Sequence, residues 1–206
     1  MTAPARYPVP AGRHRVEEEI KRSRFITTLA RAATIDEAAA FVREVAAEFQ
    51  DATHNCWAYV VGPPGDTGRV GMSDAGEPHG TAGRPMLSVL LHSGVGDIAA
   101  VVTRYYGGTK LGTGGLVRAY SSGVQKALAA LPRAEHVERV RLEITVPYAA
   151  VSALQQLFPG FEAEVTGERF ETDVRFELRL PGVNAAGFRT AVLDATRGQA
   201  VITPLV

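Results

Sequence analysis

The chain has 206 residues, 46% of them hydrophobic, and its 22 Lys and Arg residues balance its 22 Asp and Glu residues. This length allows one large domain or two small ones, and zero net charge excludes the strongly basic composition of a dedicated nucleic-acid-binding domain. The single cysteine, Cys56, excludes an intramolecular disulfide. No apolar run reaches the ~20 residues of a membrane span, and the N-terminus lacks the apolar stretch of a signal peptide. We therefore expect a cytoplasmic protein that has no membrane partner.

The first quarter of the chain predicts strands followed by a helix. Three prolines in residues 1–12 favour an irregular lead-in. Residues 14–32 alternate in part and predict two strands or one bent strand, with the basic cluster 21–24 at the bend. That cluster either contacts phosphate or forms a solvated turn. Residues 34–49 predict a helix, because they open with the spacing of a capping box and carry an apolar stripe.

A buried strand is predicted at 55–62. If His54 begins this strand, His54 and Cys56 point to one face. They lie too far apart for a good hydrogen bond, so Cys56 is interpreted as a small core residue rather than a nucleophile. His54 either contacts a ligand or makes a hydrogen bond at the start of the strand. Residues 63–69 are of the types that form turns and predict a hairpin or a mobile loop. Residues 70–83 contain too many glycines for a regular element.

A short helix beginning at Arg84 and Pro85 leads into a nearly continuous apolar run at 97–106, which is typical of a central strand buried on both faces. Arg104, near the end of this run, needs a partner or an exit to solvent. After a glycine-rich loop, a helix is predicted at 116–131. Its N-terminus favours a bound anion, and Arg118 in the first turn would oppose the helix dipole unless an anion lies nearby.

Glycines and cations are concentrated between residues 73 and 122. Glycine allows close approach to the backbone, so two glycine-rich loops beside cations predict an anion site, although tight turns alone explain any single glycine. The residues expected to bind phosphate or nucleic acid are Arg104, Lys110, Arg118, Gly107, Gly108, Gly112, Gly114, Gly115 and Thr81.

Titratable side chains lie beside the same loops. Asp74 and Glu77 either hold Mg²⁺ next to a phosphate or cap backbone N–H groups. If the protein is an enzyme, the candidate catalytic residues are Asp74, Glu77, His54 and His79. No cofactor is predicted. If the site does bind an ion or small molecule, the candidates are Mg²⁺ and a phosphate or nucleotide anion. The loop 107–115 is not a P-loop, no GxSxG, HExxH or CxxC motif occurs, and the histidines lack zinc spacing.

After a linker at 132–135, the remaining residues predict the order βαββαβ, the ferredoxin-like pattern. The predicted strands and helices lie at 137–146, 148–158, 161–166, 172–180, 183–196 and 200–205. This part contains no cluster of His, Cys or cations, and it is interpreted as a packing or protein-contact module. The predicted domains are therefore 1–132 and 137–206.

Four contiguous blocks carry a family resemblance. KRSRF at 21–25, ATHNCWAY at 52–59, SDAGEPHGTAGRPML at 73–87 and VVTRYYGGTKLGTGGLVRAYS at 101–121 resemble the signature of the YigZ/IMPACT family. Ala75 departs from it, since the family usually has a second Asp or another polar residue there, which weakens a paired-Asp metal site. The resemblance implies an α+β protein: a ribosomal protein S5 domain 2-like domain followed by a small ferredoxin-like domain.

Two functions remain open. The family's eukaryotic member restrains the kinase pathway that shuts down translation initiation, so the resemblance implies a binding protein that contacts ribosome, RNA or a translation factor. The alternative is an enzyme acting on a small phosphorylated or carboxylated substrate in the same pocket. No DNA-specific motif is present, and the sequence does not predict an oligomeric state.

Overall fold

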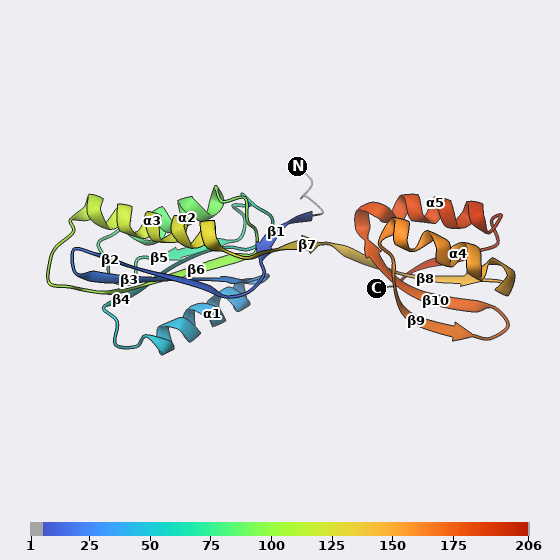
Figure 1. Cartoon of the computed structure of the whole chain (residues 1–206), viewed down its shortest axis with the longest axis horizontal. Coiled ribbons are helices and arrows are strands. Elements are labelled where there is room, and N and C mark those ends of the chain that lie inside the picture. Colours follow the sequence, from blue (N-terminus) through green and yellow to red (C-terminus); the bar gives the residue numbers. More distant parts are fainter. Residues whose placement is uncertain (1–5, 206) are drawn as a thin grey trace. The chain divides into compact units, whose positions relative to one another are not determined.

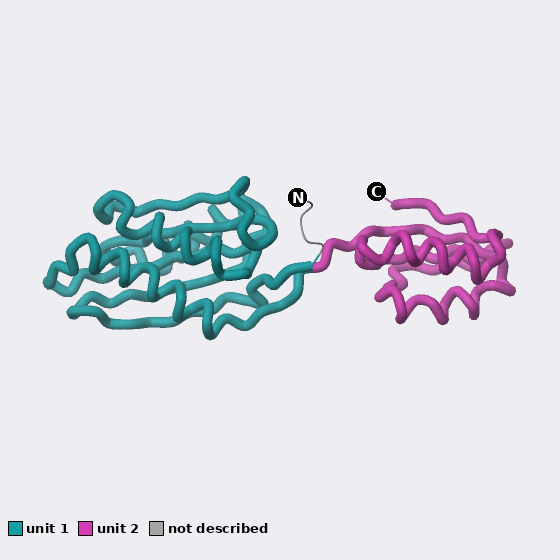
Figure 2. Tube along the Cα trace, turned by 90° about the horizontal axis from the view of Figure 1, so that it is seen from above, with its two compact units in different colours: residues 1–136 teal, residues 137–206 magenta. Residues whose placement is uncertain are grey.

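The computed structural model describes residues 6–205, and the chain divides into two compact units, Met1–His136 and Val137–Val206 (Figure 2). Both units mix strands and helices, so the α+β class is confirmed. Within residues 6–205, no helix combines the length and apolarity that crossing a bilayer requires.

The N-terminal unit is a five-stranded antiparallel sheet with helices on both faces. The sheet order is β2-β3-β6-β4-β5; α2 and α3 cover one face and α1 covers the other (Figure 1). In chain order its elements are β1 (Arg6–Pro10), β2 (His14–Ile20), β3 (Ser23–Arg31), α1 (Ile35–Glu48), β4 (His54–Val60), β5 (Val70–Ser73), α2 (Gly83–Leu91), β6 (Ile98–Tyr105), α3 (Thr113–Ala130) and β7 (Arg133–Val137).

Strand β6 is the centre of this unit, as its continuous apolar run predicts. Ala100 and Val102 pack beneath α2 and α3, while Ala99 and Val101 pack against α1. Because side chains alternate along a strand, both faces need apolar residues here. The polar Arg104 therefore comes at the place where this double-sided core ends.

Three segments differ from the sequence-based expectations. The part of the proline-containing lead-in that the structure describes forms strand β1, which pairs with β7 at the position of the expected linker. Residues 70–73 form the short edge strand β5 within the stretch expected to be irregular. Helix α3 begins at Thr113 rather than at Leu116, which moves Arg118 from the first turn into the second.

The C-terminal unit has the ferredoxin-like arrangement, since its strands order as β11-β8-β10-β9 and its helices pack on one face (Figure 1). The Arg139–Glu164 ion pair links β8 to β9. The elements are β8 (Arg139–Val146), α4 (Val151–Leu157), β9 (Glu164–Phe170), β10 (Val174–Pro181), α5 (Ala185–Ala195) and β11 (Val201–Leu205), with short 3₁₀ turns at Tyr148–Ala150, Pro159–Phe161 and Gly182–Asn184.

Candidate functional site

A cleft of about 510 Å³ opens where β4 begins, β6 ends and α3 begins. Five of the candidates named from the sequence line it together: His54, Glu77, Arg104, Lys110 and Gly112. The full lining is Thr53, His54, Glu77, Pro78, Arg104, Tyr106, Lys110, Leu111, Gly112, Thr113 and Leu116.

The floor of the cleft is a buried ion pair. Arg104 Nη1 donates to Glu77 Oε1 at 2.6 Å, and the two side chains are 6% and 3% exposed. Phe25 and Tyr106 lie on the guanidinium, with ring centroids 5.4 and 5.5 Å from its carbon. The partner that Arg104 was expected to need is therefore Glu77, and this pairing removes Arg104 from the set of freely available cations.

A second donor holds the same carboxylate. The Tyr120 hydroxyl, from the buried face of α3, donates to Glu77 Oε1 at 2.8 Å. Burial, and then the neighbouring Cys56 and Glu77, raise the pKa of this hydroxyl well above its usual range, so it remains a neutral donor. Burial also raises the pKa of the Cys56 thiol to about 12, which agrees with the interpretation of Cys56 as a core residue and not a nucleophile.

His54 is held in one orientation at the wall of the cleft. Its Nδ1 lies 2.9 Å from the carbonyl oxygen of Ala75, which accepts only, so Nδ1 carries the proton. In the neutral ring this leaves the lone pair on Nε2, which lies 3.9 Å from Glu77 Oε2. The arrangement presents a proton acceptor beside a buried carboxylate.

Asp74 has a structural role in the glycine-rich loop. Its Oδ2 accepts from the Gly80 N–H, and its Oδ1 accepts from the N–H groups of Ala82 and Gly83 at the start of α2. Burial raises the pKa of this carboxyl, but the three backbone donors and the nearby His79 outweigh burial and lower it overall. Asp74 is thus the capping residue that the sequence offered as one of two alternatives.

The remaining candidates of this loop lie outside the cleft lining. The Thr81 hydroxyl is buried and donates to the carbonyl of Pro78 at 2.6 Å. The His79 side chain is fully exposed, and its Nδ1 lies 3.8 Å from Asp74. Among residues 6–205, no group of three or more His, Cys, Asp and Glu is arranged to hold a metal ion, and Asp74 and Glu77 are each turned to different partners.

The rim of the cleft is formed by the loop before α3. Gly107 packs against the β2–β3 turn, and its N–H donates to Ser23 Oγ at 3.2 Å. Lys110 is exposed at the rim, and Gly112 is the N-cap of α3 without a side-chain hydrogen bond. Gly108 and Gly112 have φ of 82° and 75°, which glycine adopts readily.

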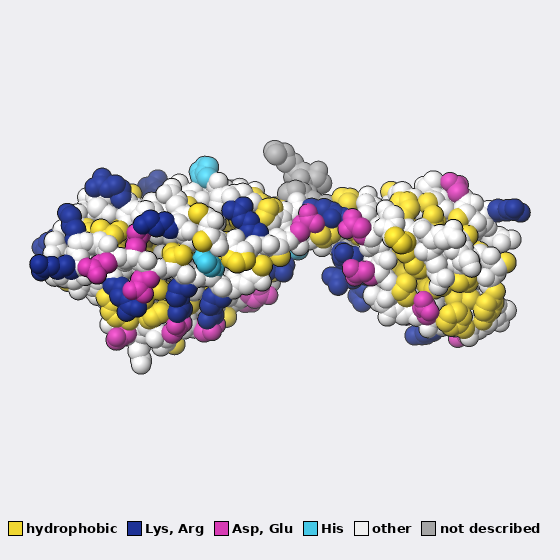
Figure 3. Space-filling model, viewed as in Figure 1, with side chains coloured by type: hydrophobic (Ala, Val, Ile, Leu, Met, Phe, Trp, Pro, Cys, Tyr) yellow, Lys and Arg dark blue, Asp and Glu magenta, His cyan; other side chains and the backbone are white. Residues whose placement is uncertain are grey.

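Arg118 lies apart from Arg104. It lines a separate hollow of about 420 Å³, together with Lys21 and one side of α3. Lys and Arg side chains, dark blue in Figure 3, gather at this end of the N-terminal unit. We call Lys21, Arg22, Lys110 and Arg118 the basic end; all four are exposed, and none has a carboxylate partner among the residues that the structure describes.

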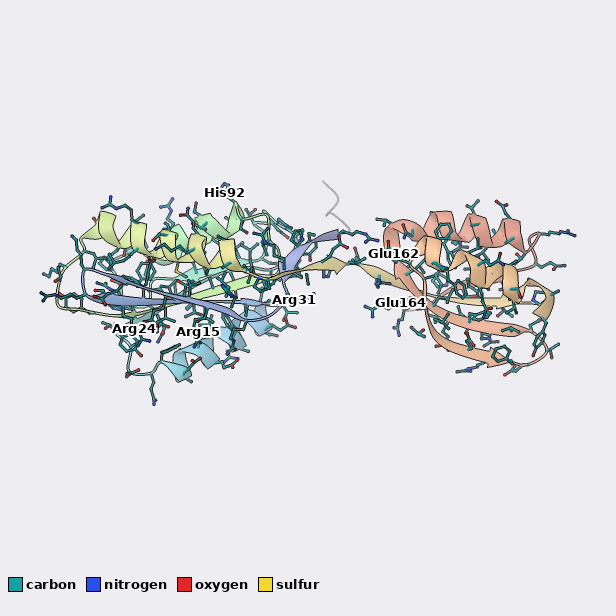
Figure 4. The ribbon with its side chains drawn as sticks, viewed as in Figure 1. Arg15, Arg24, Arg31, His92, Glu162 and Glu164 are labelled. Atoms are coloured by element: carbon teal, nitrogen blue, oxygen red, sulfur yellow. The ribbon has the colours of Figure 1, made fainter. Side chains whose placement is uncertain are left out.

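Other charged residues of the strands are already paired. Arg24, the last member of the basic cluster 21–24, binds Glu17 through two hydrogen bonds of 2.6 and 2.9 Å. Arg15 likewise binds Glu48 of α1, and both arginines lie on the α1 side of the sheet (Figure 4). Only the first half of the cluster therefore contributes to the basic end.

Sequence reasoning missed Tyr120 and Tyr106 as members of the site. Tyr120 lies on the buried face of α3, and because a buried tyrosine hydroxyl needs a partner, this residue could have pointed to a polar group beneath the helix. Tyr106 is 46% exposed beside Arg104, and its position after a buried strand gave no sign of that contact.

Comparisons with known proteins show which family the chain is similar to. The family profile described as "Impact N-terminal domain" matches residues 21–128, and that described as "Domain of unknown function (DUF1949)" matches residues 144–199. "IMPACT family member YigZ" of Escherichia coli is 43% identical over 190 residues, 92% of this chain and 93% of that protein. "IMPACT family member" of Haemophilus influenzae is 42% identical over 198 residues, 96% of each.

A solved structure described as "Crystal structure of an hypothetical protein" is 40% identical, covers 98% of each chain and has a TM-score of 0.70. The fold defines a two-domain α+β protein, whose N-terminal domain has a five-stranded sheet with helices on both faces and whose C-terminal domain is ferredoxin-like. The chain belongs to the IMPACT family.

Proposed function

We propose that this protein acts in translation as a binding or regulatory protein that contacts RNA of the ribosome through the basic end. The observation that carries the proposal is the exposure of four cations without carboxylate partners, among the described residues, beside a glycine-rich loop in a chain whose net charge is zero. Phosphate contacts by Lys and Arg supply most sequence-independent affinity for nucleic acid. The family resemblance supports translation as the setting.

The test is co-sedimentation of the full chain with ribosomal subunits across a salt series. We expect Lys21→Gln/Arg22→Gln/Arg118→Gln to weaken binding at low salt and to reduce the slope of log K against log salt by about 1 for each phosphate that is no longer neutralised. Lys110 is left unchanged because it also lines the cleft. Glutamine retains part of each side chain's aliphatic stem, so the change is chiefly one of charge.

A matched control neutralises three exposed cations elsewhere, Arg43, Arg69 and Arg189, giving the same net charge. It should bind like the wild type. Equal weakening in both variants would indicate a general charge effect, and undiminished binding by the basic-end variant would overturn the proposal. Absence of wild-type binding at low salt would do the same.

A second candidate function is favoured by the orientation of His54. An enzyme acting on a small phosphorylated or carboxylated substrate needs a positioned proton acceptor, and Nε2 of His54 beside Glu77 is such a group. Lys110, which no carboxylate pairs among the described residues, would then offset the negative charge of the substrate.

A screen for turnover of small phosphorylated and carboxylated compounds tests this candidate. Any activity should fall by about 10²-fold or more in His54→Asn. The asparagine amide can still donate to the Ala75 carbonyl, but it has no group equivalent to Nε2. An activity that His54→Asn retains would exclude His54 as the proton acceptor, and thermal unfolding of the variant would verify its fold.

A further inference from the structure

The first turn of α3 faces the cleft without the groups that usually compensate a helix N-terminus. Its N-cap, Gly112, makes no side-chain hydrogen bond, and no acidic residue lies in the first turn. The N–H groups of Thr113, Gly114 and Gly115 have no carbonyl partner within the helix. No side chain among residues 6–205 accepts from them, so the positive end of an 18-residue helix is left uncovered.

Gly114 is unexplained by the fold itself. It is exposed, its φ is not positive, and a Cβ placed there would meet no atom within 4 Å. Alanine would therefore fit, and it would favour the helix more than glycine does. A glycine that neither the backbone nor the packing requires is consistent with an object outside the chain approaching this turn closely.

Arg104 gives an independent indication of a ligand. It lines the same cleft and is 5% exposed, yet its Nε–H has no acceptor among the described residues. A buried N–H group without a partner is costly and rare in folded proteins. Lys110 adds a positive charge at the rim that no carboxylate of the described residues pairs.

We propose that the cleft binds a small phosphorylated molecule, whose phosphate lies on the first turn of α3 beside Lys110 and whose remainder extends toward His54 and Tyr106. Consecutive backbone N–H groups at a helix N-terminus suit the several oxygens of a phosphate. The volume of about 510 Å³ lies in the range of small-molecule sites. This proposal deepens the second candidate function, because it names the ligand class of the same cleft. It rests on that function only for the position of the ligand. It concerns binding and requires no turnover.

The experiment is a titration of the ¹⁵N-labelled full chain with inorganic phosphate at constant ionic strength, followed by NMR. We expect saturable shifts of the Thr113, Gly114 and Gly115 amide signals, with a dissociation constant in the millimolar range. Acetate at the same concentration should shift them much less. Equal shifts with acetate, or no saturable shift with phosphate, would overturn the proposal.

Gly114→Asp is the decisive variant. A carboxylate in the first turn favours the helix dipole, so this variant should fold and melt at or above the wild-type temperature, while its charge repels phosphate and weakens binding about tenfold or more. Gly160→Asp in the C-terminal unit, another exposed glycine with open space, is the matched control and should bind phosphate normally. Unchanged binding in Gly114→Asp would exclude the first turn of α3. Ribosome binding and turnover are measured in separate experiments. A negative result in either of them can therefore be told apart from a negative result in the phosphate titration.

Discussion

Arg104→Met is expected to lower the free energy of unfolding of the N-terminal unit by about 3–5 kcal/mol, because it leaves the Glu77 carboxylate buried without a cationic partner. The Tyr120 hydroxyl, which also donates to Glu77, cannot supply the missing charge. Methionine fills much of the space of the arginine stem between Phe25 and Tyr106. The loss of stability should therefore be chiefly electrostatic.

The measurement is urea unfolding followed by fluorescence of Trp57, the single tryptophan of the chain, which lies in β4 of the N-terminal unit. This probe reports the unfolding of that unit even if the two units unfold separately. The control is the double variant Arg104→Met/Glu77→Leu. A buried ion pair replaced by apolar side chains of similar volume is often nearly neutral, so the double variant should recover most of the stability.

A decrease below about 1 kcal/mol for Arg104→Met would show that water or rearranged groups compensate Glu77, and that the pair is not buried in solution as described. A double variant as unstable as the single one would instead assign the effect to packing. In either case Arg104 would no longer indicate a ligand. Its ion pair with Glu77 would then not hold the guanidinium in the floor of the cleft.

Local patterns in the sequence predicted the elements that build the cleft. Thr34 is the N-cap that the capping-box spacing at 34–37 predicted: its Oγ1 accepts from the Glu37 N–H at 3.1 Å, while Glu37 accepts from the N–H of Ala33, one residue before the N-cap. Alternation along β4 predicted that His54 and Cys56 share one face; Cys56 packs in the core under α2 and α3, whereas Trp57 packs on the opposite face with α1. These features depend only on backbone periodicity, which residue spacing carries directly.

The side-chain partners could not be predicted in this way. Glu77 and Arg104 are 27 residues apart in sequence and meet only because the loop after β5 folds over the end of β6. The start of α3 was misplaced because the two glycines in its first turn have low helix propensity. That error of three residues moved Arg118 into the predicted site, whereas the structure places it at a separate hollow. Likewise, β1 and β7 pair with each other although nearly the whole sequence of the N-terminal unit separates them, and no local pattern indicates such a pairing.

Gly107→Ala is expected to destabilise the N-terminal unit by about 3 kcal/mol, the upper end of the range for overpacking. A Cβ at this position would lie 1.9 Å from the carbonyl oxygen of Arg22 and 2.1 Å from its carbon. Both are backbone atoms of the β2–β3 turn, so no side-chain rotation relieves the clash. The loop must move away from the turn, which also breaks the hydrogen bond from the Gly107 N–H to Ser23 Oγ.

Two neighbouring glycines serve as controls, since each is present for a different reason. Gly108 has φ of 82° and open space, so Gly108→Ala should cost about 1 kcal/mol through backbone strain alone. Gly114 has neither restriction, and Gly114→Ala should stabilise the helix by about 0.5–1 kcal/mol. The three variants, measured by Trp57 fluorescence in urea, should rank in the order Gly107, Gly108, Gly114 from the largest decrease in stability to an increase. A decrease for Gly114→Ala would mean that its backbone is constrained by the fold, and Arg104 alone would then indicate a ligand at the first turn of α3.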